Sequence, residues 1–105
     1  MITKDYTIAQ QLKEKLSTIV KIEDFRVFGS RARGDNDEYS DLDIYIVVNK
    51  KDKELEKKIL GITWEVGFQN YIIISPLVYT LNEIQNTPIR SSSIVNVIQE
   101  EGIPV

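Results

Sequence analysis

The sequence predicts a single domain, spanning residues 1–105, of the α/β (α+β) class. Apolar residues recur at helical spacing in two long segments, and three apolar runs have the length and pattern of strands. The composition is that of an ordinary globular protein, with 42% hydrophobic and 28% charged residues. A chain of 105 residues is also long enough to bury a core without disulfides.

The first expected element is a helix over residues 5–20, which carries its apolar residues on one face. Strands are expected over residues 25–28 and 41–48. A helix over residues 52–66 follows, with an apolar stripe made of Leu55, Ile59, Ile62, Thr63 and Val66. We expect its charged residues to face solvent, and Trp64 to fill the core rather than stack on a base.

The third expected strand, over residues 71–80, is interrupted by Pro76. Proline has no N–H for a sheet ladder, so this strand either lies at an edge, where a second subunit would cover it, or is buried with a bulge. The rest of the chain predicts a short helix over residues 82–86. A last helix is expected over residues 88–101, with Thr87 as its N-cap.

A glycine and a serine follow the first strand, in the run Val27-Phe28-Gly29-Ser30-Arg31-Ala32-Arg33-Gly34. A turn at Gly29 and Ser30 brings free backbone N–H groups to the strand end, where they favour an anion such as phosphate. Arg31 and Arg33 can add charged contacts to phosphate oxygens. Taken alone, the motif is more typical of an exposed turn with two surface arginines.

The second strand begins with Ser40-Asp41-Leu42-Asp43, and its period of two puts Asp41 and Asp43 on one face. Their Cα atoms are then about 7 Å apart, at a rise of about 3.3 Å per residue. Carboxylates at this spacing suit one divalent ion or a pair, and they favour magnesium over zinc. Taken alone, an Asp-x-Asp is more typical of a solvated strand end than of a metal site, so the interpretation depends on its place directly after the turn.

Missing residue types exclude several kinds of chemistry. The chain has no cysteine and no histidine, which excludes thiolate catalysis, zinc-thiolate sites and a Ser-His-Asp triad. The carboxylates, arginines and hydroxyls that remain suit metal-assisted phosphoryl chemistry. A net charge of −3 argues against general nucleic-acid binding. No segment has the pattern of a signal peptide or of a membrane-spanning helix, so we expect a cytoplasmic protein without membrane contact.

Together, Gly29-Ser30-x-Ala32-Arg33-Gly34 and Ser40-Asp41-x-Asp43-Ile44 resemble the signature of the minimal nucleotidyltransferases, in the polymerase-β-like nucleotidyltransferase superfamily. The resemblance implies a palm-like mixed sheet with helices packed mainly on one face. It also implies magnesium-dependent transfer of a nucleoside monophosphate from a nucleoside triphosphate, expected to be ATP, to a hydroxyl. Asp41 and Asp43 would be catalytic and hold two metal ions. The nucleotide would contact Gly29, Ser30, Arg31, Arg33 and Ser40.

The chain departs from the family pattern in one respect, because the run from residue 70 to residue 79 lacks the usual third carboxylate. Glu65 is the nearest substitute as a metal ligand, and Glu83 is a more distant one. The departure leaves open a nucleotide- or partner-binding subunit that does not turn over, and a plain scaffold whose acids face solvent. The resemblance further implies a small helical partner of the HEPN type, in a toxin–antitoxin pair in which the transferase modifies the partner.

Overall fold

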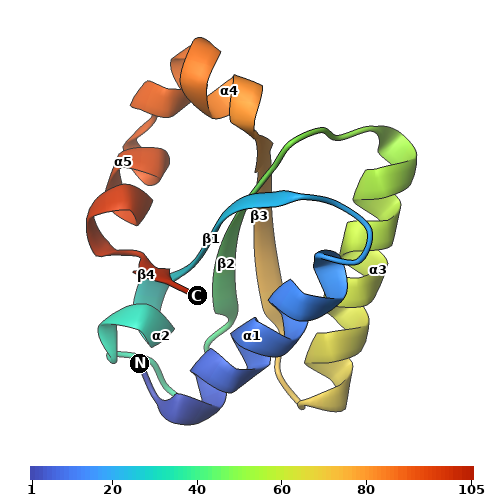
Figure 1. Ribbon diagram of the computed structural model, residues 1–105. Coiled ribbons are helices and arrows are strands. Elements are labelled where there is room, and N and C mark those ends of the chain that lie inside the picture. Colours follow the sequence, from blue (N-terminus) through green and yellow to red (C-terminus); the bar gives the residue numbers. More distant parts are fainter.

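The computed structural model describes residues 1–105, which fold around a four-stranded sheet with the strand order β3-β2-β1-β4 (Figure 1). None of its helices has the length and apolarity that a membrane crossing needs. The elements are α1 (Thr3–Leu16), β1 (Ile22–Phe28), α2 (Gly29–Arg33), β2 (Leu42–Val48), α3 (Lys53–Gln69), β3 (Ile74–Thr80), α4 (Leu81–Asn86), a 3-10 turn η1 (Pro88–Ser91), α5 (Ser93–Glu101) and β4 (Ile103–Pro104).

The sheet is mixed, as expected. β1 pairs antiparallel with both β2 and β4, and β2 pairs parallel with β3 through the crossover helix α3. In the β1–β2 ladder Phe28 lies opposite Asp43, and in the β2–β3 ladder Asp43 lies beside Ser75. The end of β1, the start of β2 and the start of β3 therefore meet at one end of the sheet.

Alternation along β2 separates two apolar clusters. The main core lies between the sheet and helices α1 and α3, and it contains the β2 residues Leu42, Ile44, Ile46 and Val48. The intervening residues Tyr45 and Val47 form a smaller cluster with Ile98 of α5 on the other face. Figure 1 shows α1 and α3 on one side of the sheet and α5 on the other. The alternation read from the sequence is thus confirmed, with most helical cover on one face.

Several predicted elements differ in detail. The third strand starts at Ile74, because residues 71–73 form the turn after α3, with Tyr71 at a left-handed φ of 57°. β3 is an edge strand, which resolves the alternative raised by Pro76. The last helix is divided, since the Ser92 side chain accepts a hydrogen bond from Val95 N and begins α5 as a separate helix. Strand β4 was not predicted.

The prediction that Trp64 fills the core is wrong. Its side chain is 71% exposed. The core-facing stripe of α3 includes buried Ile59, Thr63 and Val66, as predicted. Trp64 lies about 160° around the helix from Val66, since successive residues are about 100° apart, and it therefore points to solvent.

Candidate active site

The turn after β1 is in direct contact with the carboxylate of Asp43. Gly29 has a φ of 75°, and a Cβ added there would overlap Oδ2 of Asp43 and lie 3.3 Å from its Cγ. Glycine is needed at this position because a side chain would be strained by the backbone and blocked by the carboxylate. The turn and the acid pair, read as separate motifs in the sequence, therefore form one site.

Gly29 is also the first residue of the short helix α2, which ends at Arg33. α2 begins without a side-chain cap at Phe28, and its first turn contains no acid. Its C-cap is Gly34, which has a φ of 85° and donates its N–H to the carbonyl of Ser30 at 2.9 Å. The first N–H groups of α2 are thus without a capping side chain, next to Asp43. Backbone donors of this kind favour an anionic ligand oxygen.

The two aspartates differ in environment. Asp41, which directly precedes β2, is exposed, whereas Asp43, the second residue of β2, is partly buried. Burial raises the pKa of Asp43 above its ordinary value of 3.8, the negative charge of Asp41 raises it further, and Arg33 partly offsets both effects. A carboxylate such as that of Asp43, whose ionised state is disfavoured, gains stability from a bound cation. The electrostatics of the pair thus favour metal binding.

Magnesium fits the donors present, but with few protein ligands. No group of three or more Asp, Glu, His or Cys side chains is arranged to hold a metal. The hard oxygens of Asp41 and Asp43 suit Mg²⁺, which commonly binds one or two carboxylates together with water and substrate phosphates. The residues present thus fit one ion better than the two-metal site implied by the resemblance.

Glu65 does not join the acid pair, which corrects its prediction as a metal ligand. It lies on the exposed side of α3, where its carboxylate accepts a hydrogen bond from Gln69 at 3.4 Å. α3 packs on the Leu42 face of the sheet, whereas Asp43 shares the opposite face with Tyr45. The sheet therefore lies between them. Glu83 caps α4 through Thr80, at the other end of β3.

Ser75 stands beside Asp43 on the next strand. The two residues are in register in the parallel β2–β3 ladder, and paired residues of a parallel ladder point to the same face. Leu77 and Tyr79, which continue this face of β3, pack with Tyr45 and confirm the orientation. A hydroxyl therefore occupies the position from which an acid on β3 would face the pair. Sequence analysis missed Ser75 because the register of β3 was unknown.

Arg31 is placed inside the molecule rather than at the predicted nucleotide site. Its Nη1 is 3.2 Å from both carboxylate oxygens of Asp5 on α1, and its Nε donates to the carbonyl of Ser40 at 2.8 Å. Both side chains of the pair are buried, with 7% and 2% exposure. The guanidinium also reaches the carbonyls of Asp37 and Glu38 at 3.4 Å. Arg31 therefore fixes the loop that leads into the Asp pair.

Of the other two side chains predicted to contact the nucleotide, Arg33 is accessible and Ser40 is bonded within its own loop. Arg33 is exposed, with its Nε 3.1 Å from Asp35 and its charge acting on Asp43. It is thus the arginine of the motif that remains open to a nucleotide. The Ser40 hydroxyl accepts a hydrogen bond from the Asp37 backbone N–H at 3.1 Å and is 3.3 Å from the Asp37 carboxylate. Ser40 consequently closes the loop before the acid pair.

Comparison with known proteins agrees with this geometry. A family model described as a nucleotidyltransferase domain matches residues 9–105. The chain belongs to the nucleotidyltransferase domain family. The family named by the resemblance is thereby confirmed, and this membership supports a transferase of the nucleotidyltransferase type.

Two further similarities place this nucleotidyltransferase domain among relatives. A protein of Methanocaldococcus jannaschii named "putative protein adenylyltransferase" is 43% identical over 75 residues, which are 69% of this chain and 76% of that protein. A crystal structure described as a "putative nucleotidyltransferase" from Sulfolobus solfataricus aligns with a TM-score of 0.53 at 20% identity. The alignment covers 96% of this chain and 81% of the S. solfataricus chain. At this level of identity it shows a shared fold.

Proposed function

We propose that this chain transfers the nucleoside monophosphate of ATP, in the presence of magnesium, to a hydroxyl group of a protein acceptor. The observation that carries the proposal is the contact between the Asp43 carboxylate and the Gly29 turn. A phosphate-binding turn and a pair of metal-binding acids must adjoin if one triphosphate is to meet both. The name of the M. jannaschii relative supports the choice of an adenylyl group and a protein acceptor.

Each residue has a defined part in this proposal. The backbone N–H groups of Gly29 and Ser30 bind oxygens of the triphosphate, and Arg33 contributes positive charge from the exposed side of α2. Asp41 and Asp43 hold magnesium, which when bound supplies the positive charge that stabilises phosphoryl transfer. Arg31 positions the loop before Asp41 through its bond to the Ser40 carbonyl.

The proposed reaction is an in-line displacement. The acceptor oxygen forms a bond to the α-phosphorus of ATP while the bond from that phosphorus to the leaving pyrophosphate breaks. The proton of the hydroxyl passes to a carboxylate, for which Asp41 and Asp43 are the available groups because the chain has no histidine. A small helical protein of the HEPN type, in a toxin–antitoxin pair, is the acceptor that we propose on family resemblance.

A second candidate function is nucleotide binding without turnover. It is favoured by the neutral hydroxyl of Ser75 at the position where a third carboxylate would face the pair. Such a subunit would bind magnesium and ATP through the same residues and release no pyrophosphate.

Calorimetric titration of ATP with magnesium tests the site. We expect saturable binding by the wild type and at least tenfold weaker binding by Asp43→Asn, with Glu65→Gln as the matched control that binds like the wild type. Equal affinity of the wild type and Asp43→Asn would overturn the proposed site. Pyrophosphate release in the presence of a candidate helical partner then separates the two functions, since only the transferase releases pyrophosphate and labels the acceptor.

A further inference from the structure

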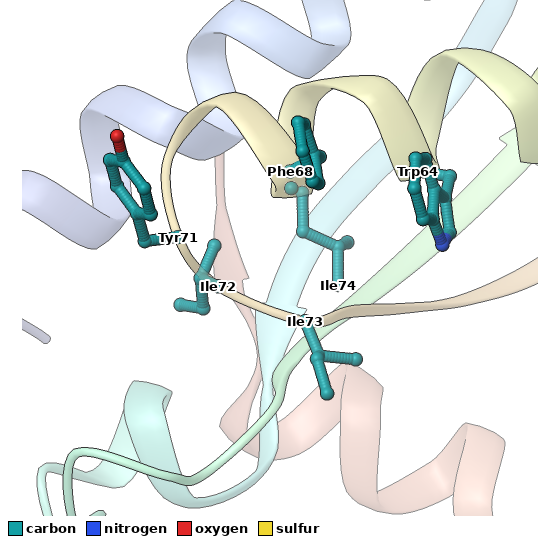
Figure 2. Close-up of a pocket in the computed structure, with 7 residues that line it drawn as sticks. Trp64, Phe68, Tyr71, Ile72, Ile73 and Ile74 are labelled. Atoms are coloured by element: carbon teal, nitrogen blue, oxygen red, sulfur yellow. The ribbon is translucent and has the colours of Figure 1, made fainter.

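The outer face of α3 is unusually apolar. Trp64 and Phe68 are 71% and 69% exposed, and their rings stack with centroids 5.3 Å apart and an interplanar angle of 10° (Figure 2). At about 100° per residue, both lie roughly opposite Val66, the centre of the core-facing stripe. The outer face of a surface helix is normally polar, so this stripe indicates a partner.

The exposed residues form one surface, which we call the outer patch: Leu60, Trp64, Phe68, Tyr71 and Ile73. It borders a hollow of about 310 Å³ between the end of α3 and the start of β3. Aromatic side chains have about 150–250 Å² of surface each. Since Trp64, Phe68 and Tyr71 are 71%, 69% and 97% exposed, these three residues together expose roughly 500 Å². With the two aliphatic residues, the patch approaches the roughly 800 Å² per partner of an ordinary protein interface.

The backbone conformation of Tyr71 is unfavourable for a residue with a side chain, and packing within the chain does not explain it. It has a left-handed φ of 57° and is 97% exposed. Glycine is the usual residue at this position after a helix, because a side chain is disfavoured in the left-handed region. An aromatic ring thus lies at the rim of the outer patch although the backbone there favours glycine, as Figure 2 shows.

Gly61 lies on the same face of α3, within about 60° of Trp64 and about 20° of Phe68 around the helix. A Cβ added at Gly61 would meet nothing within 4 Å. Packing inside the chain therefore gives no reason for a glycine in the middle of this helix, where it is less favourable than alanine. Close approach of another surface would give one.

We propose that the outer patch is the interface of a symmetric homodimer, in which α3 packs antiparallel against α3 of a second copy. A two-fold axis at the level between Gly61 and Trp64 places the indole of each copy over Gly61 of the other, where there is no side chain. The same operation pairs Lys57 with Phe68 of the second copy. A stripe that is complementary to itself in this way satisfies the requirement of a two-fold interface.

Charge supports the same arrangement. Lys57 is exposed and has no ion-pair partner within the chain. Antiparallel packing brings it over an aromatic ring, which favours a cation, and near the carboxyl-terminal end of the other helix, where the helix dipole is negative. The edge of the sheet is a poorer site for self-association, because Pro76 lacks an N–H and Lys51 donates to the Val78 carbonyl at 3.3 Å.

Sedimentation velocity of the full chain over about a hundredfold range of concentration tests the proposal. We expect a monomer–dimer equilibrium whose dissociation constant rises at least tenfold in Phe68→Glu and in Gly61→Gln. The second variant removes no contact and improves helix propensity, so its loss of dimer cannot be attributed to unfolding. The matched control is Val97→Glu, at an apolar position of α5 that is 44% exposed; it should dimerise like the wild type.

Fluorescence gives an independent readout, because Trp64 is the single tryptophan. We expect its emission to shift to shorter wavelength as concentration rises, and this shift to be absent in Gly61→Gln. A wild type that stays monomeric throughout the range would overturn the proposal and leave the patch to a different protein. Dimers that persist in both Phe68→Glu and Gly61→Gln would also overturn it.

Discussion

Asp5 and Arg31 form a buried ion pair that ties α1 to the turn carrying the candidate active site. Arg31 Nη1 is 3.2 Å from each carboxylate oxygen of Asp5, and the two side chains are 26 residues apart in the chain. The remaining donors of Arg31 are directed at loop carbonyls, among them that of Ser40. The position of Asp41 thus depends on a residue of the first helix.

We predict that Asp5→Asn lowers the free energy of unfolding by about 3 kcal/mol, because it leaves the buried charge of Arg31 without its partner. Urea denaturation measures this loss. Asp35→Asn is the matched control, since it breaks the exposed Arg33–Asp35 pair of 3.1 Å and should cost less than about 1 kcal/mol. Equal losses in the two variants would contradict the structural part assigned to the buried pair.

Asp43 should make stability depend on pH in the direction opposite to most carboxylates. Its pKa is raised in the folded protein, so the native state holds this proton to higher pH than the unfolded state does. The contribution of Asp43 to the free energy of unfolding therefore falls as pH rises above 3.8 and through the raised pKa. We expect Asp43→Asn to be more stable than the wild type at pH 7 and equally stable at pH 3.

Magnesium provides the control for that measurement. At neutral pH, added magnesium should raise the melting temperature of the wild type and leave Asp43→Asn unchanged, because a ligand stabilises only the protein that binds it. If magnesium leaves the melting temperature of the wild type unchanged, both with ATP and without it, the result would argue against the acid pair as a metal site.

Ser75→Asp should strengthen metal binding. A carboxylate there would stand beside Asp43 in the β2–β3 ladder and supply a third charged ligand. We expect magnesium or manganese affinity to rise about tenfold, as carboxylate count is a main determinant of affinity for hard cations. Without metal, the added charge should cost about 0.5–1 kcal/mol of stability through repulsion between neighbouring strands. Ser75→Asn, which adds bulk without charge, should show neither effect.

Tyr71→Gly should stabilise the fold while weakening the proposed dimer. The substitution relieves the left-handed strain and is expected to raise the free energy of unfolding of the monomer by about 1 kcal/mol. Thermal denaturation at a concentration where the protein is monomeric measures this gain. Tyr39→Gly is the comparison, because Tyr39 is 85% exposed without a positive φ and should bring no gain.

Local sequence patterns were sufficient to predict the two faces of the central strand β2 and the contact between Gly29 and Asp43. The period of two that starts at Asp41 assigned both faces of β2 correctly, because both faces of that strand are packed and Asp43 is its one acidic residue. The meeting of Gly29 with Asp43 followed from two motifs joined by a short connection. The outward position of Trp64 was also available from helical phase, since Thr63 had been placed in the core stripe.

Other features depend on contacts that no local pattern encodes. The burial of Arg31 requires Asp5, and nothing near either residue indicates that the two will meet. The register that sets Ser75 beside Asp43 is fixed by the crossover through α3, which a strand pattern does not specify. The division of the last helix at Ser92 was hidden within three consecutive serines, each of which can cap a helix.

The exposed edge of β3 is poorly suited to pair with another strand, and this affects how the protein associates at high concentration. An incoming strand would find no donor at Pro76 and a lysine side chain across the carbonyl of Val78. At the opposite margin, β4 offers only two residues. Continuous ribbons of stacked sheets are therefore disfavoured, and concentrated samples should form discrete particles rather than fibrils.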